Sequence, residues 1–477
     1  MKTEINKYEL WFLTGSQHLY GDDTLRQVES NSLEISTYLE SQSDIIITIK
    51  FKAVLTSAES IHKMIKDANH NDNCIGIICW MHTFSPAKMW INGLKILHKP
   101  LLHLHTQFNR DIPWSTLDMN FMNLNQSAHG GREFGFICNR MQIKRKVVVG
   151  HWTDSVIIQK ISNWSRAALG WADSQQMKIA RFGDNMREVA VTEGNKVSAQ
   201  IQFGYSVNGF GLGDLVEHIK LASDTAISEL VTAYEDMYIL MPSLLKNGTQ
   251  RSSLIEAAKI EIGMRSFLEA GGFTAFTTTF ENLHGLTQLP GLAVQRLMSA
   301  GYGFAAEGDW KIAALVRTIK CMAAGLPGGN SFMEDYTYHF SNDGDSVLGA
   351  HMLEICPSIS NNQVRCEVHP LGIGGKEDPV RLIFNAAHGP ALNASMIDGG
   401  DHFRLLVNEV EAQTIDYQMP KLPVARVLWK PLPNLHTATE AWITAGGAHH
   451  TCYSQNISTE ILQDFAEIAS VEIVVIR

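Results

Sequence analysis

The sequence predicts an α/β protein with three domains: two Rossmann-like α/β domains with parallel sheets, followed by a C-terminal, mostly antiparallel β-barrel domain. The 477 residues are too many for a single hydrophobic core. Strand-like and helix-like segments alternate through the first two thirds, which is typical of parallel sheets covered on both faces. A glycine-rich stretch at residues 325–329 then precedes shorter β-like runs. We therefore expect domains at residues 1–177, 178–328 and 329–477.

The first domain is predicted from apolar and β-branched runs that alternate with helical segments. The expected strands are residues 8–14, 44–49, 74–80, 101–105 and 147–149. The expected helices are residues 24–39, 57–68, 86–97 and 154–169. Polar residues directly follow three of these strands. Because ligands gather beyond the carboxyl ends of parallel strands, we expect a binding edge there.

The second and third domains are predicted from a change in pattern. The expected elements of the second are helices at residues 214–238, 254–269 and 310–324, a helix after Pro290, and a Thr-rich strand at 273–280. The expected strands of the third are residues 337–340, 351–355, 364–368, 380–384, 424–429 and 472–476. These short, separated runs predict an antiparallel β domain.

The composition indicates a globular enzyme and argues against nucleic acid or membrane partners. The chain is 45% hydrophobic and 18% charged, with a net charge of −10 and no cluster of Lys and Arg. Nucleic acids and anionic membranes both require basic patches. No run is long enough to span a bilayer, and the first residues lack the apolar core of a signal peptide. Seven cysteines without a Cys-x-x-Cys pair predict free thiols and a cytoplasmic location.

Four short segments in the second half carry side chains suited to one hard divalent metal. They contain Glu307, Glu334, His351 and the pair His449-His450, each beside glycines or at the edge of an apolar run. Taken singly, such residues are more often helix caps or surface groups. Together, two carboxylates and two imidazoles suit Mn²⁺ or a similar first-row ion. Their charge balances that of a divalent ion, which favours a neutral polyol or sugar over a phosphate.

Long strings of distinctive residues run through the chain in a fixed order. They occupy residues 11–21, 82–90, 105–109, 123–133, 181–187, 277–285, 307–311, 331–340 and 446–450. In these strings the sequence resembles the L-arabinose isomerase family, nearly from end to end. The resemblance implies that Glu307, Glu334, His351 and His450 hold one Mn²⁺ per subunit, with Co²⁺ as a possible substitute.

The resemblance also implies a reaction, the conversion of L-arabinose to L-ribulose and, as a further activity, of D-galactose to D-tagatose. Glu307 and Glu334 are expected to combine metal ligation with acid/base catalysis through an enediol. Which glutamate takes the proton stays open, and a metal-bridged hydride shift would use the same ligands. Neighbouring residues of an extended strand point to opposite faces. Since the family places the second histidine on the metal, His450 is the expected ligand and His449 a supporting or structural residue.

Substrate contacts and an oligomer are further implications of the resemblance. The expected substrate-binding residues are Gln17, Leu19, Phe84, His129, Met186, Thr277 and Phe280. In the resembling enzymes the His129 position comes from a neighbouring subunit, which implies a homo-oligomer, either a hexamer built from trimers or a tetramer. Family members usually continue beyond the position of Arg477. Every expected site residue precedes it, so we expect the chemistry to be retained.

Three other functions fit part of the pattern. An isomerase acting on L-fucose or another sugar would share the metal and the reaction and differ only in its pocket contacts. A sugar-binding protein with an α/β fold would not need the four-ligand set. A metallohydrolase would release a cleaved product instead of an isomer. Metal-dependent C1–C2 isomerisation separates an isomerase from a sugar-binding protein or a hydrolase, and a panel of aldoses identifies the sugar.

Overall fold

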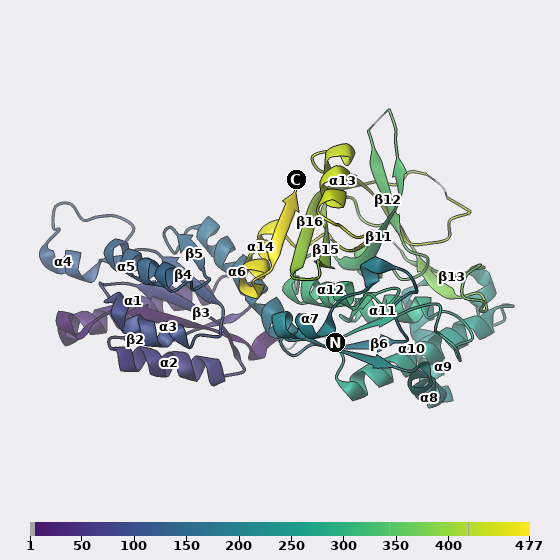
Figure 1. The fold of residues 1–477 in the computed structure, drawn as a ribbon, viewed down its shortest axis with the longest axis horizontal. Coiled ribbons are helices and arrows are strands. Elements are labelled where there is room, and N and C mark those ends of the chain that lie inside the picture. The colour runs from purple at the N-terminus through teal and green to yellow at the C-terminus, as the bar shows by residue number, and fades with distance from the viewer. Residues whose placement is uncertain (1–4, 343, 362, 418) are drawn as a thin grey trace. The chain divides into compact units, whose positions relative to one another are not determined.

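The computed structural model describes residues 5–342, 344–361, 363–417 and 419–477, and the chain divides into two compact units (Figure 1). The large unit comprises Asp173–Thr459 and Ala469–Arg477. The N-terminal unit comprises the described residues up to Ala172 together with Glu460–Ile468. Within the described residues, none of the helices combines the length and the apolar character needed to cross a membrane.

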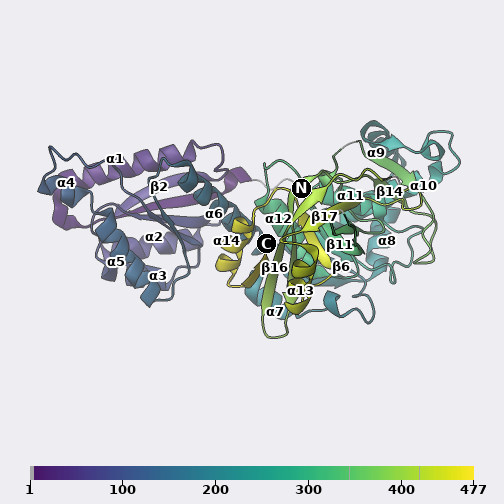
Figure 2. The same ribbon diagram turned by 90° about the horizontal axis from the view of Figure 1, so that it is seen from above.

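The N-terminal unit contains a five-stranded parallel sheet in the order β2-β1-β3-β4-β5. Its strands are β1 (Glu9–Gly15), β2 (Thr48–Leu55), β3 (Cys74–Met81), β4 (Leu101–His105) and β5 (Lys146–Val149). Its helices are α1 (Gly21–Glu40), α2 (Ala58–His70), α3 (Ile91–Lys95), α4 (Met119–Leu124), α5 (Ser127–Arg140), α6 (Ser155–Ser174) and α14 (Thr459–Ala469). Figure 2 shows α1 on the opposite face of this sheet from α2, α3 and α5. Coverage on both faces explains why every residue of β3 is apolar or Gly and buried.

Helix α14 brings a late segment of the chain into the N-terminal unit. Lys146, at the start of β5, donates hydrogen bonds to Glu460 (3.0 Å) and to Asp464 (2.6 Å) of α14. Asn163 of α6 donates a further hydrogen bond to Glu460 (2.9 Å). The N-terminal unit is therefore not continuous in sequence.

The large unit begins with a second parallel sheet, in the order β10-β9-β6-β7. Its strands are β6 (Lys178–Phe182), β7 (Ser206–Phe210), β9 (Ala275–Thr278) and β10 (Gly303–Ala305). The helices of this region are α7 (Lys196–Phe203), α8 (Leu212–Lys220), α9 (Asp224–Met237), α10 (Arg251–Gly271), α11 (Gly291–Ser299) and α12 (Trp310–Met322). A small sheet follows, of β14 (Val380–Ile383), β13 (Arg365–Val368) and β8 (Ile239–Leu240).

The C-terminal region closes into a six-stranded antiparallel barrel, in the order β15-β18-β11-β12-β17-β16 with β16 pairing back onto β15. The barrel strands are β11 (Asn330–His339), β12 (Ser346–Ala350), β15 (Gly389–Asp398), β16 (Phe403–Gln413), β17 (Arg426–Pro431) and β18 (His450–Ser454). β19 (Glu472–Ile476) adds to β16 in parallel, and α13 (Leu435–Thr444) follows β17. The predicted fold class is confirmed: two parallel-sheet regions and a mostly antiparallel barrel.

Several expected elements differ from the observed ones. Residues 214–238 form two helices, because Ser223 interrupts the helix and caps α9 by accepting from the Ala226 N–H (3.2 Å). The strand expected at 351–355 is wrong, since β12 ends at Ala350. The strand expected at residues 44–49 lies further along the chain in the structure, where β2 begins at Thr48.

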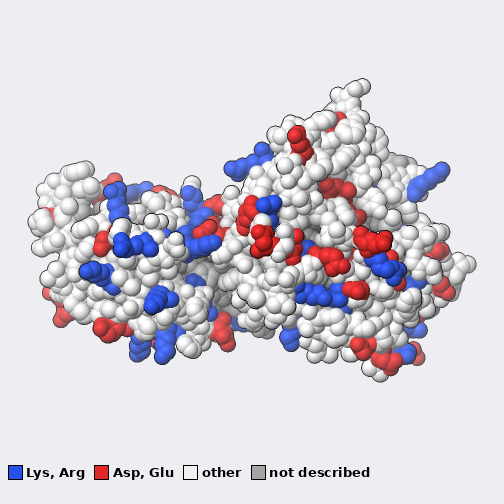
Figure 3. Space-filling model, viewed as in Figure 1, with Lys and Arg blue, Asp and Glu red and all other residues white. Residues whose placement is uncertain are grey.

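On the face of the molecule shown in Figure 3, both basic and acidic side chains are exposed, with basic ones more frequent on the N-terminal unit and acidic ones on the large unit. The formal net charge of the whole chain is −10.

Candidate active site

Three neighbouring barrel strands bring together three of the predicted metal ligands. Glu334 lies on β11, directly opposite His450 of β18 on one side and Ala350 of β12 on the other. His351 follows Ala350, at the point where β12 ends. Phe332 packs edge-on against both imidazoles, with ring centroids 5.2 Å apart in each case. The pairing register of the barrel therefore places residues from positions 334, 351 and 450 side by side.

The fourth predicted ligand, Glu307, lies in the tight turn between β10 and α12. Glu307 has a φ of +60° and Gly308 a φ of +83°, so two successive residues adopt left-handed conformations. The turn is held by a hydrogen bond from the Met186 N–H to the Glu307 carbonyl (2.9 Å) and by one from Asn185 to the Gly308 carbonyl (3.1 Å). A strained non-glycine residue fixed from outside in this way is typical of functional sites.

The side-chain atoms of these residues converge. His450 Nε2 lies 3.1 Å from Glu334 Oε1 and 3.6 Å from Glu307 Oε2. His351 Nε2 lies 3.5 Å from the same oxygen of Glu334. The structure therefore brings the four residues predicted as metal ligands into one cluster.

His449 also reaches this cluster. One ligand atom from each of Glu307, Glu334, His449 and His450 lies within 4.8 Å of the others, a group that could hold a metal ion. The alternation expected for an extended strand does not separate the two histidines, because β18 begins only at His450. His449 is exposed whereas His450 is fully buried. Both imidazoles are therefore available to the carboxylates.

The electrostatics of the cluster fit a cation. His450 Nε2 is buried and has no hydrogen-bond partner. Burial opposes protonation of His351, but Glu334 and Glu354 outweigh it and raise the pKa of its imidazole to about 9. Likewise, burial opposes protonation of His450, but Asp309, Glu307 and Glu334 raise its pKa well above the ordinary value. A site that favours positive charge so strongly, with mixed oxygen and nitrogen donors, suits a divalent first-row ion.

Two further carboxylates contact Nδ1 of His450 and His351, the ring nitrogen that does not face Glu334. The sequence did not predict either of them. Asp309 Oδ2 lies 3.1 Å from His450 Nδ1, and Glu354 Oε2 lies 2.6 Å from His351 Nδ1. Asp309 follows Glu307 by two residues and Glu354 follows His351 by three, so proximity in sequence was the only available signal. Asp309 is completely buried and forms an ion pair with the buried Lys311 (3.0 Å).

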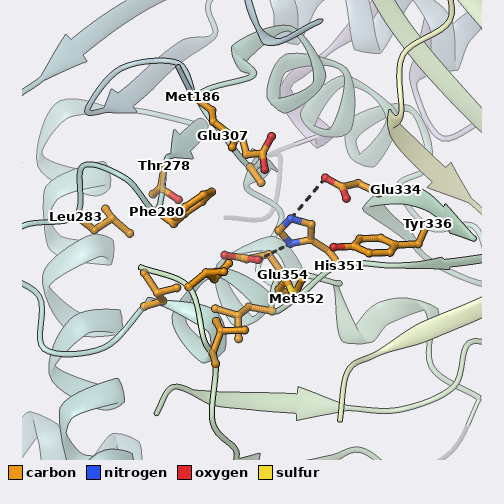
Figure 4. A pocket seen from close by; sticks show the side chains of 15 residues that line it. Met186, Thr278, Phe280, Leu283, Glu307, Glu334, Tyr336, His351, Met352 and Glu354 are labelled. Carbon is orange, nitrogen blue, oxygen red and sulfur yellow. Dashed lines mark hydrogen bonds and ion pairs between the residues drawn. The ribbon is translucent and has the colours of Figure 1, made fainter. Parts of the chain in front are cut away.

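A cavity of about 210 Å³ opens beside the cluster (Figure 4). Its lining includes the predicted residues Met186 and Phe280 together with Glu307, Glu334 and His351. Thr277 does not line it, because its hydroxyl donates to the Ala305 carbonyl (2.6 Å) within the sheet, and Thr278 lines it instead. Further lining residues that the sequence did not single out are Leu283, Leu289, Ala306, Tyr336, Met352, Leu353, Glu354, Leu371 and Ile373. This cavity is polar at the carboxylates and apolar elsewhere, which is typical of a small-molecule site.

The other predicted substrate-binding residues lie at the carboxyl edge of the sheet in the N-terminal unit. Gln17 is half-buried after β1, and Leu19 is 81% exposed in the short 3-10 helix His18–Tyr20. Phe84 follows β3 and stacks on His129 of α5, with ring centroids 4.5 Å apart. The His129 Nδ1 lies 3.1 Å from Gln126 Oε1. These four residues thus occupy the edge at which the strand pattern predicts a ligand.

The fold and the carboxylate–imidazole cavity define a multidomain α/β enzyme. The sequence matches the L-arabinose isomerase N-terminal domain over residues 4–176, the L-arabinose isomerase central domain over 178–325, and the L-arabinose isomerase C-terminal domain over 329–472. It is 59% identical to an L-arabinose isomerase of Geobacillus stearothermophilus, over 99% of this chain and 95% of the relative. It is 60% identical to one from Anoxybacillus flavithermus, over 99% of this chain and 94% of that relative. The chain belongs to the L-arabinose isomerase family.

Proposed function

We propose that the chain is a metal-dependent aldose–ketose isomerase that converts L-arabinose to L-ribulose, with D-galactose to D-tagatose as a second activity. The observation that carries this proposal is the cluster formed by Glu307, Glu334, His351 and His450, of which the first three line one cavity. The names of the relatives supply the sugar. A bound divalent cation would neutralise the two carboxylates of the cavity, so a neutral, open-chain sugar suits it. Mn²⁺ is the proposed ion and Co²⁺ its substitute.

The reaction moves hydrogen between C1 and C2 of the open-chain sugar. A divalent ion in the site would polarise the carbonyl and stabilise charge on the neighbouring oxygens. Glu307 and Glu334 are the carboxylates at the cavity that can take a proton from one carbon and return it to the other through an enediol. A positioned carboxylate contributes typically about 10²–10⁴ in rate. Met186 and Phe280 give the cavity apolar surface against which C–H groups can pack.

Removal and return of the metal tests this proposal. Protein treated with chelator is expected to lose L-arabinose isomerisation and to regain it with Mn²⁺, and to a lesser extent with Co²⁺. A panel of aldoses, including D-galactose and L-fucose, is assayed in parallel for the ketose product. Full turnover by protein shown to be metal-free by elemental analysis would contradict the metal requirement, and turnover of L-fucose alone would contradict the sugar.

Gln17, Leu19, Phe84 and His129 enter the proposal as substrate contacts, of which His129 comes from a neighbouring subunit of a cytoplasmic homo-oligomer, either a hexamer built from trimers or a tetramer. A surface with an 81%-exposed leucine and an exposed histidine stacked on Phe84 suits contact with a further molecule.

A mixing experiment tests whether sites are shared between subunits. A His129→Ala variant and a Glu334→Gln variant are each expected to be inactive. After subunit exchange, some sites would combine an intact His129 from one chain with an intact Glu334 from another, so activity should return in part. Exchange confirmed by mass spectrometry without any return of activity would show that His129 does not serve a neighbour's site. As a control, Thr439→Ala, a change in helix α13, replaces one of the two variants in the same mixing experiment.

A further inference from the structure

The two buried imidazoles of the site share one arrangement. Each presents Nε2 to Glu334, at 3.1 Å for His450 and 3.5 Å for His351. Each also presents Nδ1 to a second carboxylate, Asp309 at 3.1 Å and Glu354 at 2.6 Å. Hydrogen bonds join the two Nδ1 atoms to Asp309 and Glu354, whereas His450 Nε2 has no hydrogen-bond partner, so a ring that carries one proton in this geometry carries it on Nδ1. The two nitrogens of each ring therefore have different partners.

Asp309 is held in place by more than its histidine. Its Oδ1 accepts from the Ile312 N–H at the start of α12 (3.3 Å) and pairs with Lys311 Nζ (3.0 Å). Lys311 Nζ in turn donates to the carbonyls of Val191 (2.9 Å) and Glu193 (2.7 Å). Both charged side chains are almost completely buried. The position of Asp309 is thus fixed by the helix and by the 191–193 backbone, independently of the barrel strand that carries His450.

We propose that Asp309, held by Lys311, and Glu354 are positioning residues that keep the Nδ1 proton on His450 and His351, so that Nε2 of each ring offers its lone pair to the divalent ion. This inference rests on the proposed metal site. A hydrogen bond from the second ring nitrogen to a carboxylate fixes both the tautomer and the orientation of a ligating imidazole and raises its basicity. Loss of such a partner typically costs about 10- to 100-fold in metal affinity.

The structure distinguishes the two carboxylates in one respect. Asp309 also caps α12, whereas Glu354 accepts only from His351 among its hydrogen bonds in the described residues. Glu354→Gln therefore tests the positioning role without disturbing a helix end. Asp309→Asn retains an oxygen that can cap the helix, but its amide can donate to Nδ1 and favour the wrong tautomer, as Asp-to-Asn changes do in catalytic triads.

The experiment measures Mn²⁺ affinity and the spectrum of the Co²⁺-loaded protein, using Asp309→Asn, Glu354→Gln and wild type. In wild type, two solvent-exchangeable, paramagnetically shifted proton signals are expected, one from each Nδ1–H. Each variant should lose or shift one of the two signals and bind Mn²⁺ about 10- to 100-fold more weakly. Asp118→Asn, an equivalent change at the N-cap of α4 in the N-terminal unit, is the matched control and should leave both measurements unchanged.

Each result decides between the two proposals. If wild type binds neither Mn²⁺ nor Co²⁺, the proposed metal site fails and the positioning role falls with it. If wild type binds both ions while Asp309→Asn and Glu354→Gln keep wild-type affinity and both signals, the positioning role is overturned and the metal site stands. Should Asp309→Asn not fold, as judged by circular dichroism, Glu354→Gln alone supports or overturns the inference.

Discussion

At the scale of single residues, the two glutamates of the site are held by different backbones. Glu334 lies in a regular strand with partners on both sides, whereas Glu307 lies in a left-handed turn. Their positions are therefore set independently, one by the barrel and the other by the β10–α12 connection. Two carboxylates placed on separate supports can be held at one cavity without sharing a strand register.

Replacing either glutamate by glutamine tests its acid/base role. Glu307→Gln and Glu334→Gln keep the size of the side chain but remove the base, so kcat should fall by at least about 10² for each. The assay uses saturating Mn²⁺, so that a lower kcat cannot result from incomplete metal binding. Glu367→Gln, a carboxylate of the small β13 sheet, is the control. A kcat within a few-fold of wild type for either site variant would exclude that residue as the proton carrier.

Residue patterns predicted the ligand cluster but not its surroundings. Glu307, Glu334 and His450 could be named because each lies in a string that the family shares, and His351 because the resemblance implied it. Asp309 and Glu354 could not, because their contacts depend on distances across the fold, such as the 141 positions between Asp309 and His450. The choice of Thr277 over Thr278 failed to match the cavity lining for a related reason. Neighbouring residues on a strand face opposite ways, and the sequence does not state which face meets the cavity.

At the scale of elements, periodic segments were well predicted and irregular ones were not. The strands expected at residues 101–105 and 472–476 coincide with β4 and β19. Helix α5 was missed because its sequence contains Gly130 and Gly131, which disfavour helices. Both glycines are required by close packing, since a Cβ at Gly131 would collide with His105 and one at Gly130 with the Thr83 carbonyl. Closure of the barrel depends on the pairing of β18 with β11 and β15, which lie far from it in sequence, and local patterns do not reveal such pairings.

The β10–α12 turn gives a prediction at this scale. A Cβ at Gly308 would lie 2.6 Å from Asn185 Cα and 2.7 Å from the Asp184 carbonyl oxygen, and the residue has a φ of +83°. Gly308→Ala should therefore displace the turn, lower the free energy of unfolding and weaken Mn²⁺ binding through Glu307. Gly325 has a φ of +76° but nothing within 4 Å of its Cβ position. Gly325→Ala should cost only about 1–2 kcal/mol, from backbone strain alone.

Denaturant unfolding and Mn²⁺ titration of the two alanine variants distinguish the effect of backbone strain from that of the steric clash at position 308. The expected order is a larger loss of stability for Gly308→Ala than for Gly325→Ala, with weaker Mn²⁺ binding only in the former. Equal losses and equal Mn²⁺ affinities in the two variants would show that the turn does not position Glu307.

At the scale of the whole molecule, the N-terminal unit contains two buried histidines that affect its response to pH. Burial lowers the pKa of His82 to about 4, and burial, assisted by His105 and Arg145, lowers that of His103 to about 3. Both pKa values lie below the unfolded value of 6.5, so the unfolded chain binds more protons between these limits. Stability should therefore be complete above pH 6.5 and fall as the pH decreases towards 4.

The expected loss is about 2 kcal/mol per histidine at pH 5. Hydrogen exchange of the full chain at pH 7 and pH 5, corrected for the intrinsic rate, should show weakened protection in β3 and β4. His103→Gln should reduce this acid sensitivity, whereas His70→Gln, at an exposed position in α2, should not. Equal acid sensitivity of wild type and His103→Gln would contradict the assignment to His103.

The placement of α14 has a consequence for the folding of the chain during its translation. Lys146 and its partner Glu460 are 314 residues apart, although both belong to the N-terminal unit. At about 5–20 residues per second, roughly 15 to 60 s pass between the synthesis of the two. During that interval the nascent sheet β1–β5 has emerged but lacks the helix that meets β5. The N-terminal unit is therefore translated first but completed only when α14 has been made. Until then, the surface of β5 that α14 meets stays uncovered in the nascent chain.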